Sequence, residues 1–590
     1  MANEFVNYLN SMNNASSSNI NSLAESQVLS NYYHEIQVTR NIGTYISEQI
    51  KQNRNECFIL TGHAGDGKTS ILVQVLRELG LLEKGKKLED RKRIKENDIE
   101  LLYVKDMSEL NKEQQVKYLE EALKCPEVNA SSILITNTGP LLNTFKALFN
   151  NDIDIENIIL NQLDSNKNDY LEIKGFRFKL INIARVDNVC FSKQILYKLV
   201  KEDLWSQCKG CDHTEYCHIC TNYNCVNNNF DRVSNFIEAY YRYLYENDKR
   251  VTIRQIVSQL SFAFTGNVSC KEIQKRKDKN IKFAYNFANL FFGFRGTHEI
   301  DNSDQIKAIK ELKALNIDSK SLDEDYNMIV RHDFSCFNED IRDIIQTKWE
   351  DFSKRYKKEI SDSNDFLLNN NTEEDINMRK ALRRFYIMYS NVNDEEDFDN
   401  KISQIFGKVF PIYNRGIINK YSKNDIKALK DLVHRAIYIN NVGVPPKGNK
   451  DDIYLTLKRN DGSFQNVFLE IGRVRKRDID IVQESVASEF DDMEYKNELF
   501  IMLDRDEDYM FPMTLPILNY FNSISEGAIV TNVNPILGHG IARLNAMLLE
   551  KFNSSNDGEL LDNECRLIIN TASETIGVKV EIDNKTLYIE

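Results

Sequence analysis

Short apolar runs alternate with helical segments through the first two hundred residues. The helical segments are marked by spacings such as Ile71, Val75 and Leu79, and each apolar run is long enough for one buried strand. The predicted strands are 57–61, 101–104, 133–136 and a hairpin of 170–173 with 176–183. Strands joined through helices of this length form mostly parallel sheets, so we expect an α/β fold with a parallel sheet.

The pattern changes further along the chain. Helical spacing dominates 231–440, whereas 83–98 is dense in charged residues and predicts a solvated helix or loop. A turn-rich stretch at 443–449 is typical of a linker, and the alternation after it predicts a hairpin over 453–471 that turns at 460–462. The expected domains are a polar and helical segment (1–50), an α/β domain (51–200), a cysteine-rich insertion (201–230), a helical lid and helical middle region (231–440) and a C-terminal α+β domain (441–590).

Composition and charge narrow the class of protein. The 590-residue chain is 42% hydrophobic and 28% charged, and it has no run long enough for a membrane span and no signal-peptide pattern at its start. We therefore expect a cytoplasmic protein with no membrane association. The net charge of −13 argues against a nucleic-acid-binding surface over the whole protein, although a local basic groove stays open. The basic run 473–477 is either a solvated face or a contact with phosphate backbone.

The stretch between the first predicted strand and its helix has the chemistry of a phosphate-binding loop. It consists of Gly62, His63, Ala64, Gly65, Asp66, Gly67, Lys68 and Thr69, followed by Ser70. In Gly-x4-Gly-Lys-Thr loops, main-chain N–H groups and the N-terminus of the next helix point at phosphate oxygens. We expect Lys68 to contact the β- and γ-phosphates of ATP and the Thr69 hydroxyl to ligate Mg²⁺. The pattern predicts a P-loop NTPase domain over 51–200.

Three polar residues join Lys68 as candidate catalytic residues. Asp106 follows the second strand, where an acid can hold Mg²⁺ through water, but it fits equally well as the cap of a helix that starts near Ser108. Asn137 follows the neighbouring strand and is placed to reach the γ-phosphate, the alternative being an ordinary loop position. Arg254 lies in the first turn of a helix, where the helix dipole disfavours a cation, so either a bound phosphate or a plain surface position accounts for it.

A second cluster has metal-ligand spacing. Its residues are Cys208, Cys211, Cys217 and Cys220, in the pattern Cys-x2-Cys-x5-Cys-x2-Cys. Two such pairs let four thiolates converge tetrahedrally, which favours a structural Zn²⁺ site. The short spacer leaves an iron–sulfur cluster and unmetallated thiols as alternatives.

These motifs together resemble those of the DptF family, the AAA-like ATP-binding component of bacterial phosphorothioation-dependent DNA restriction. The resemblance rests on the glycine loop, the Thr-Asn-x-Gly-Pro-Leu sequence at 136–141, the cysteine cluster after Trp205 and the helix that opens with Thr252-x-Arg254, and it covers roughly 20–300. It implies ATP bound at the glycine loop and metal at the cysteines. It also implies companion restriction or defence subunits that bring the protein to DNA lacking sulfur modification.

Two other functions stay open at this stage. The chain could be a nucleotide-operated switch or scaffold without appreciable turnover, since no Glu follows Asp106. It could also be a DNA-dependent motor subunit, which requires an electropositive path for the nucleic acid. A homo-oligomer is compatible with each of these functions. The ATP-hydrolysing restriction component is the interpretation that uses both motifs.

Overall fold

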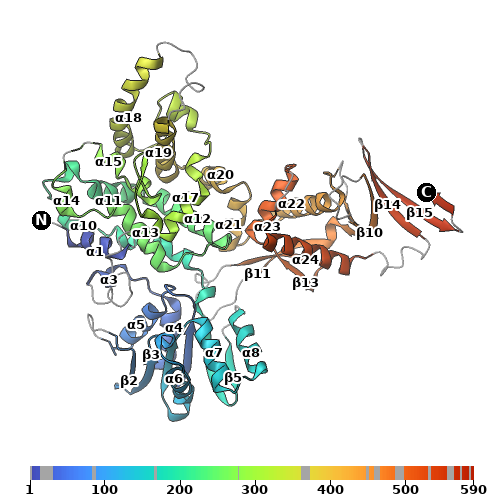
Figure 1. Ribbon diagram of the computed structural model, residues 1–590, viewed down its shortest axis with the longest axis horizontal. Helices are drawn as coiled ribbons and strands as arrows, with labels where there is room; N and C mark the ends of the chain where they lie inside the picture. Colours follow the sequence, from blue (N-terminus) through green and yellow to red (C-terminus); the bar gives the residue numbers. More distant parts are fainter. Residues whose placement is uncertain are drawn as a thin grey trace. The chain divides into compact units, whose positions relative to one another are not determined.

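The computed structural model shows a mixed α/β protein in two compact units (Figure 1). The structure describes residues 3–13, 31–52, 54–82, 88–96, 98–164, 169–276, 278, 280–360, 373–446, 451–457, 466–484, 497–528, 533–553, 564–571, 574–583 and 586–589. The first unit is Met1–Phe406, and the second contains Gly407–Val486 and Lys496–Glu590. Within the described part of the chain, no helix is both long and apolar enough to cross a bilayer.

A six-stranded sheet forms the framework of the first unit, in the order β2-β3-β4-β1-β6-β5. Its strands are β1 (Cys57–Thr61), β2 (Arg91–Glu96), β3 (Ile99–Val104), β4 (Ser131–Ile135), β5 (Tyr170–Ile173) and β6 (Phe176–Asn182). The four central strands are parallel, as the sequence predicts, and each edge strand is antiparallel to its neighbour. The predicted turn between β5 and β6 is formed by Lys174 and Gly175, both with positive φ, which suits a tight hairpin.

Helices cover both faces of this sheet. Its neighbours are α4 (Asn41–Lys51), α5 (Lys68–Glu78), α6 (Lys112–Lys124), α7 (Thr138–Leu148) and α8 (Ile153–Asp164). Cys57 and Ile59 of β1 share a core with α6, α7 and α8, whereas Phe58 packs against Tyr45 of α4. Because successive side chains of a strand point to opposite faces, β1 is buried on both sides, which explains its unbroken apolar sequence.

The charged segment 83–98 differs from its prediction. Residues 91–96 form the edge strand β2 rather than a helix or loop, while 83–87 and 97 lie outside the described residues. Only Ile94 of this strand is buried. Dense charge on an edge strand discourages pairing with other chains, so the solvation was predicted correctly but the element was not.

Helices make up most of the rest of the first unit. They are α1 (Glu4–Met12), α3 (Asn31–Ile36), α9 (Phe191–Leu199), α10 (Glu202–Trp205), α11 (His218–Asn228), α12 (Phe230–Glu246), α13 (Ile253–Thr265), α14 (Cys270–Ile273), α15 (Ile281–Ala284), α16 (Phe287–Phe291), α17 (Lys307–Leu315), α18 (Glu339–Ile360), α19 (Glu373–Tyr389) and α20 (Glu395–Phe406). The short strands β7 (Phe294–Arg295) and β8 (His298–Glu299) form a two-stranded sheet. The helical character predicted from 231 onward is confirmed here. Helix α13 is central to this region, since it contacts α1, α9, α11, α16 and α17.

The second unit combines helices with antiparallel sheets. Its helices are α21 (Phe410–Ile418), α22 (Lys423–Val442), α23 (Leu515–Ser525) and α24 (Pro535–Lys551). Its strands are β9 (Asp452–Leu457), β10 (Val467–Arg475), β11 (Ile479–Glu484), β12 (Glu498–Leu503), β13 (Asp506–Pro512), β14 (Glu564–Asn570), β15 (Thr575–Asp583) and β16 (Thr586–Ile589). The antiparallel pairing of β9 with β10 confirms the predicted hairpin, whose turn at 460–462 lies outside the described residues together with 447–449 of the linker.

Candidate nucleotide site and candidate metal centre

The glycine loop connects β1 to α5 in a conformation that depends on its glycines. Gly62, Gly65 and Gly67 have φ of +149°, +92° and +89°, values that residues with a side chain rarely adopt. Gly67 is also the N-cap of α5, in the left-handed region. The order strand, glycine loop and helix is therefore the one that the sequence predicts.

Lys68 is held inside this loop. Its Nζ donates to the carbonyl oxygens of Gly62 at 2.8 Å and His63 at 2.9 Å, and to Oδ1 of Asn137 at 3.0 Å. The residue is only 7% exposed, and burial lowers the pKa of its ammonium group, an effect that nearby Asp66 and Asp106 oppose and Arg254 reinforces. Of the other candidate catalytic residues, Asn137 thus contacts Lys68 directly, and Asp106 and Arg254 lie close enough to act on its charge.

The ends of β3 and β4 are joined next to the lysine by Ser108. Its Oγ accepts a hydrogen bond from the Asn137 main-chain N–H at 2.8 Å, and its own N–H donates to Oδ1 of Asp106 at 2.9 Å. Asp106 is the cap of the short 3-10 helix η2 (Met107–Glu109), one of the two interpretations of this residue. Ser108 was not predicted as a site residue, although the Asp-x-Ser spacing is typical of such a turn.

The start of α13 rests on the glycine loop. A side chain on Gly65 would meet Thr252 Oγ1 at 3.0 Å and Arg254 Cβ at 3.6 Å, and one on Gly67 would meet Ile253 Cδ1 at 3.6 Å. Thr252 is the N-cap of α13 in a capping box with Gln255, so this helix opens where the sequence predicts. The N-termini of α5 and α13 therefore both lie at the loop, and their dipoles add positive potential there.

Asp66 connects the glycine loop to neighbouring segments of the chain. Its buried carboxylate accepts from the His63 N–H at 2.9 Å and lies 3.5 Å from Arg250 Nη2, with Asn188 Nδ2 also at 3.5 Å. Arg250 in turn donates to the carbonyl oxygens of Ile183 and Val186, just after β6. Arg250 and Asn188 were not predicted as site residues, because nothing local distinguishes them from other polar residues.

The remaining loop residues divide by exposure. His63 and Ala64 are exposed, whereas Thr69 at the start of α5 is half-buried. The Ser70 hydroxyl accepts a hydrogen bond from Tyr33 of α3 at 3.0 Å. Arg40 also contacts the loop. Its Nη1 donates to the Asp66 carbonyl at 3.4 Å, and its guanidinium stacks on Phe191. Arg40, Arg250 and Arg254 thus surround the loop with positive charge, which suits an anionic ligand.

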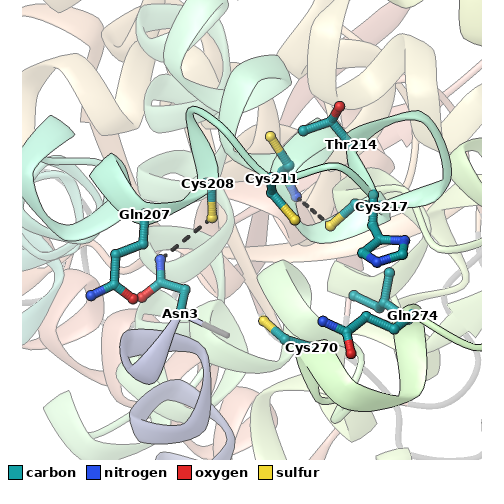
Figure 2. Close-up of a pocket in the computed structure, with 11 residues that line it drawn as sticks. Asn3, Gln207, Cys208, Cys211, Thr214, Cys217, Cys270 and Gln274 are labelled. Carbon is teal, nitrogen blue, oxygen red and sulfur yellow. Dashed lines mark hydrogen bonds between the residues drawn. The ribbon is translucent and has the colours of Figure 1, made fainter. Parts of the chain in front are cut away.

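The predicted metal ligands gather around a cavity of about 30 Å³ in the first unit (Figure 2). The lining residues are Asn3, Gln207, Cys208, Cys211, His213, Thr214, Cys217, Cys220, Cys270, Ile273 and Gln274. All four thiols of the predicted set are included. A fifth, Cys270 of α14, was not predicted, because it lies far from the others in sequence.

Two of these sulfur atoms accept hydrogen bonds from N–H groups. Asn3 Nδ2 donates to Cys208 Sγ at 3.4 Å, and the Cys220 main-chain N–H donates to Cys217 Sγ at 3.4 Å. Burial, together with the neighbouring thiols, raises the pKa of Cys217 to about 12 and raises the pKa of Cys208 and Cys220 as well. As placed, no three His, Cys, Asp or Glu side chains within the described ranges converge closely enough to hold an ion.

Helix α11, which begins directly after Cys217, is tied to the C-terminal end of α13. The buried His218 donates through Nε2 to the Thr265 carbonyl at 3.0 Å, and burial lowers its pKa to about 4. Asn222 Nδ2 donates to the Phe264 carbonyl at 3.0 Å. These bonds supply partners for carbonyl groups at the end of α13 that the helix itself leaves unsatisfied.

No protein-family model, curated protein or solved structure matches the chain. The glycine loop, the residues that surround it and the cysteine cavity are therefore the features that point to a function.

Proposed function

We propose that this chain binds ATP with Mg²⁺ at the glycine loop and is the ATPase component of a bacterial DNA restriction or defence system. The observation that carries the nucleotide part is the position of Lys68. Its ammonium group is buried inside a loop of glycines with positive φ, at the ends of β1, β3 and β4. A buried lysine beside main-chain N–H groups and two helix N-termini is suited to polyanionic phosphate.

Each surrounding residue has a distinct role in this proposal. Lys68 exchanges one of its protein acceptors for a phosphate oxygen, and Thr69 is placed at the helix start to hold Mg²⁺. Asn137 contacts the lysine directly and is the candidate to orient the γ-phosphate or the attacking water. Arg254 approaches from α13, the proposed lid of a P-loop NTPase domain. Mg²⁺ would supply charge neutralisation of the transferred phosphoryl group.

The restriction role follows from the resemblance to the DptF family, and the charge distribution agrees with indirect contact to DNA. The basic run 473–477 is partly neutralised within the second unit. Arg473 pairs with Glu470 at 3.0 Å and lies 3.5 Å from Asp452, and Lys476 pairs with Asp431. Cations engaged in this way release less free energy on binding phosphate backbone, so companion subunits are the better candidates for the DNA contact.

A nucleotide-operated switch is the second candidate, and one observation favours it. Asp106 already caps η2, and Met107 rather than a glutamate follows it. A site without a firmly placed carboxylate base binds nucleotide more readily than it hydrolyses it.

We further propose that the cysteine cavity is a structural metal centre, with Zn²⁺ as the expected ion and an iron–sulfur cluster as the alternative. The donor set supports this, because five thiols line one small cavity and two sulfur atoms accept N–H hydrogen bonds. Hydrogen bonds of this kind stabilise the thiolate, which is the form of cysteine that binds metal. Burial raises the pKa of Cys217 and so disfavours its thiolate unless a cation lies beside it.

The nucleotide proposal is tested by measuring binding of a fluorescent ATP analogue. Lys68→Ala should abolish binding, whereas the exposed Lys112→Ala on α6 should bind like the unaltered protein. Equal affinity in both variants would refute the site. ATP turnover with and without DNA then separates an ATPase from a switch, which binds nucleotide but shows no turnover in either case.

A further inference from the structure

Cys270 reaches the cysteine cavity from a different part of the chain. It is the first residue of α14, which follows α13 after a short turn, whereas the other four cysteines lie between 208 and 220. Figure 2 shows its sulfur on the opposite side of the cavity from Cys211 and Cys217, at the end of a side chain that extends into the same space.

Asn3 lines the cavity together with Cys270 and the predicted set. Its side-chain Nδ2 donates to Cys208 Sγ at 3.4 Å and to the Leu204 carbonyl at 3.0 Å, and its Oδ1 accepts from the N–H of Phe5, which caps α1. This buried residue therefore holds the start of α1 at the cavity that Cys270 shares with the predicted set.

We infer that Cys270 is a ligand of the metal centre, so that one of the thiols at 208–220 is the uncoordinated fifth. This inference rests on the proposed metal centre. A tetrahedral Zn²⁺ ion takes four ligands, and an iron–sulfur cluster is likewise held by four cysteines. With Cys270 as a ligand, the metal joins the cysteine segment to α14 instead of closing a single local loop.

The first test substitutes Co²⁺ for the native metal in the full-length protein and measures the sulfur-to-cobalt charge-transfer absorption. Cys270→Ser should lower this absorption by about a quarter, the share of one ligand in four, and weaken metal binding by more than about tenfold. Cys565→Ser, which changes a partly buried cysteine on β14 of the second unit, is the matched control and should change neither. A Cys270→Ser protein that behaves like Cys565→Ser would overturn the inference.

The second test needs no variant, so it stands even if Cys270→Ser fails to fold. The unaltered protein is alkylated with iodoacetamide before and after the metal is chelated, and each cysteine is followed by mass spectrometry. We expect Cys270 and three of the four cysteines at 208–220 to react only after chelation, and one of the four to react in both states. Equal reactivity of Cys270 before and after chelation would overturn its assignment as a ligand. Protein that contains no zinc or iron and takes up no Co²⁺ would instead refute the metal centre itself.

Discussion

Arg250 lies 3.5 Å from the buried carboxylate of Asp66, so a cation just before α13 is paired with an acid inside the glycine loop. Asp66 is fully buried, whereas the Arg250 side chain is 20% exposed. Because the arginine also donates to two carbonyl groups after β6, the pair connects three segments around the candidate nucleotide site. The loop geometry therefore depends on a residue distant in sequence.

Breaking this pair should weaken both folding and nucleotide binding. Asp66→Asn leaves Arg250 without its partner charge, so we expect a loss of about 1–3 kcal/mol in unfolding free energy, together with weaker ATP binding. The exposed Lys112→Ala on α6 should change stability by less than about 0.5 kcal/mol. Urea unfolding and ATP titration measure the two effects, and an Asp66→Asn protein as stable as Lys112→Ala would show that the pair is incidental.

Gly65 should tolerate no side chain. With φ of +92° and Thr252 Oγ1 only 3.0 Å from where a Cβ would lie, Gly65→Ala strains the loop and pushes against α13. We expect a cost of about 1–3 kcal/mol and a marked loss of ATP affinity. Gly538→Ala, in the first turn of α24, meets only an ordinary contact at 3.8 Å and should be neutral or stabilising. Thermal unfolding of both variants tests the comparison.

Asn137→Ala should separate binding from turnover. If Asn137 orients the γ-phosphate or the attacking water, its loss slows turnover by about 10–1,000-fold while ATP binding stays close to normal, since the loop and Lys68 supply most ground-state contacts. Asn161→Ala, an exposed change on α8, is the control. Normal turnover in Asn137→Ala would exclude a catalytic role for Asn137 and leave its hydrogen bond to Lys68 as its contribution to the site.

Lys401 of α20 should make stability depend on pH. The side chain is 4% exposed beside Arg232, Cys336 and the ring of Tyr386, and burial lowers its pKa to about 7. Between pH 7 and its unfolded pKa the unfolded chain binds more protons, so this group makes the protein more stable as pH rises, by up to about 1.4 kcal/mol per pH unit.

Replacing this lysine removes that dependence. Lys401→Met should be more stable than the unaltered protein at pH 7, and the difference should shrink by pH 9, as measured by urea unfolding at both pH values. The exposed Lys310→Met on α17 should follow the unaltered protein at both. A constant difference between pH 7 and pH 9 would contradict the lowered pKa of Lys401.

The isolated chain should bind duplex DNA weakly. A net charge of −13 and a basic run engaged in ion pairs leave little cationic surface to displace counterions. We expect affinity to fall by orders of magnitude between about 50 and 200 mM salt, and to recover only with companion subunits. Tight binding by the chain alone that resists salt would place the DNA contact on this protein.

Local signals predicted the parts of the site that are contiguous in sequence. The apolar run of β1, the glycines after it and the capping residue Thr252 each have a local backbone preference. The sequence therefore predicted β1, the loop and the start of α13 correctly. The β2 strand was missed because its charges, typical of a solvated helix, also suit an exposed sheet edge.

Long-range partners left no such signal. Arg250, Asn188 and Cys270 owe their positions to packing between segments, and a single arginine, asparagine or cysteine is common enough in any sequence to pass unnoticed. Cys270 is instructive, because the Cys-x2-Cys pairs already supplied a complete set of four ligands and gave no reason to look for another.

Helix α13 connects the two candidate ligand sites. Its first residues contact the glycine loop, and the carbonyl groups of its last turn accept hydrogen bonds from His218 and Asn222 next to the cysteine cavity. The two ends of this 13-residue helix lie about 20 Å apart. A displacement of one end of this helix along its axis would reach the other end, so coupling between the two candidate sites can be measured. By thermodynamic reciprocity, any factor by which a bound metal changed ATP affinity would equal the factor by which ATP changed metal affinity.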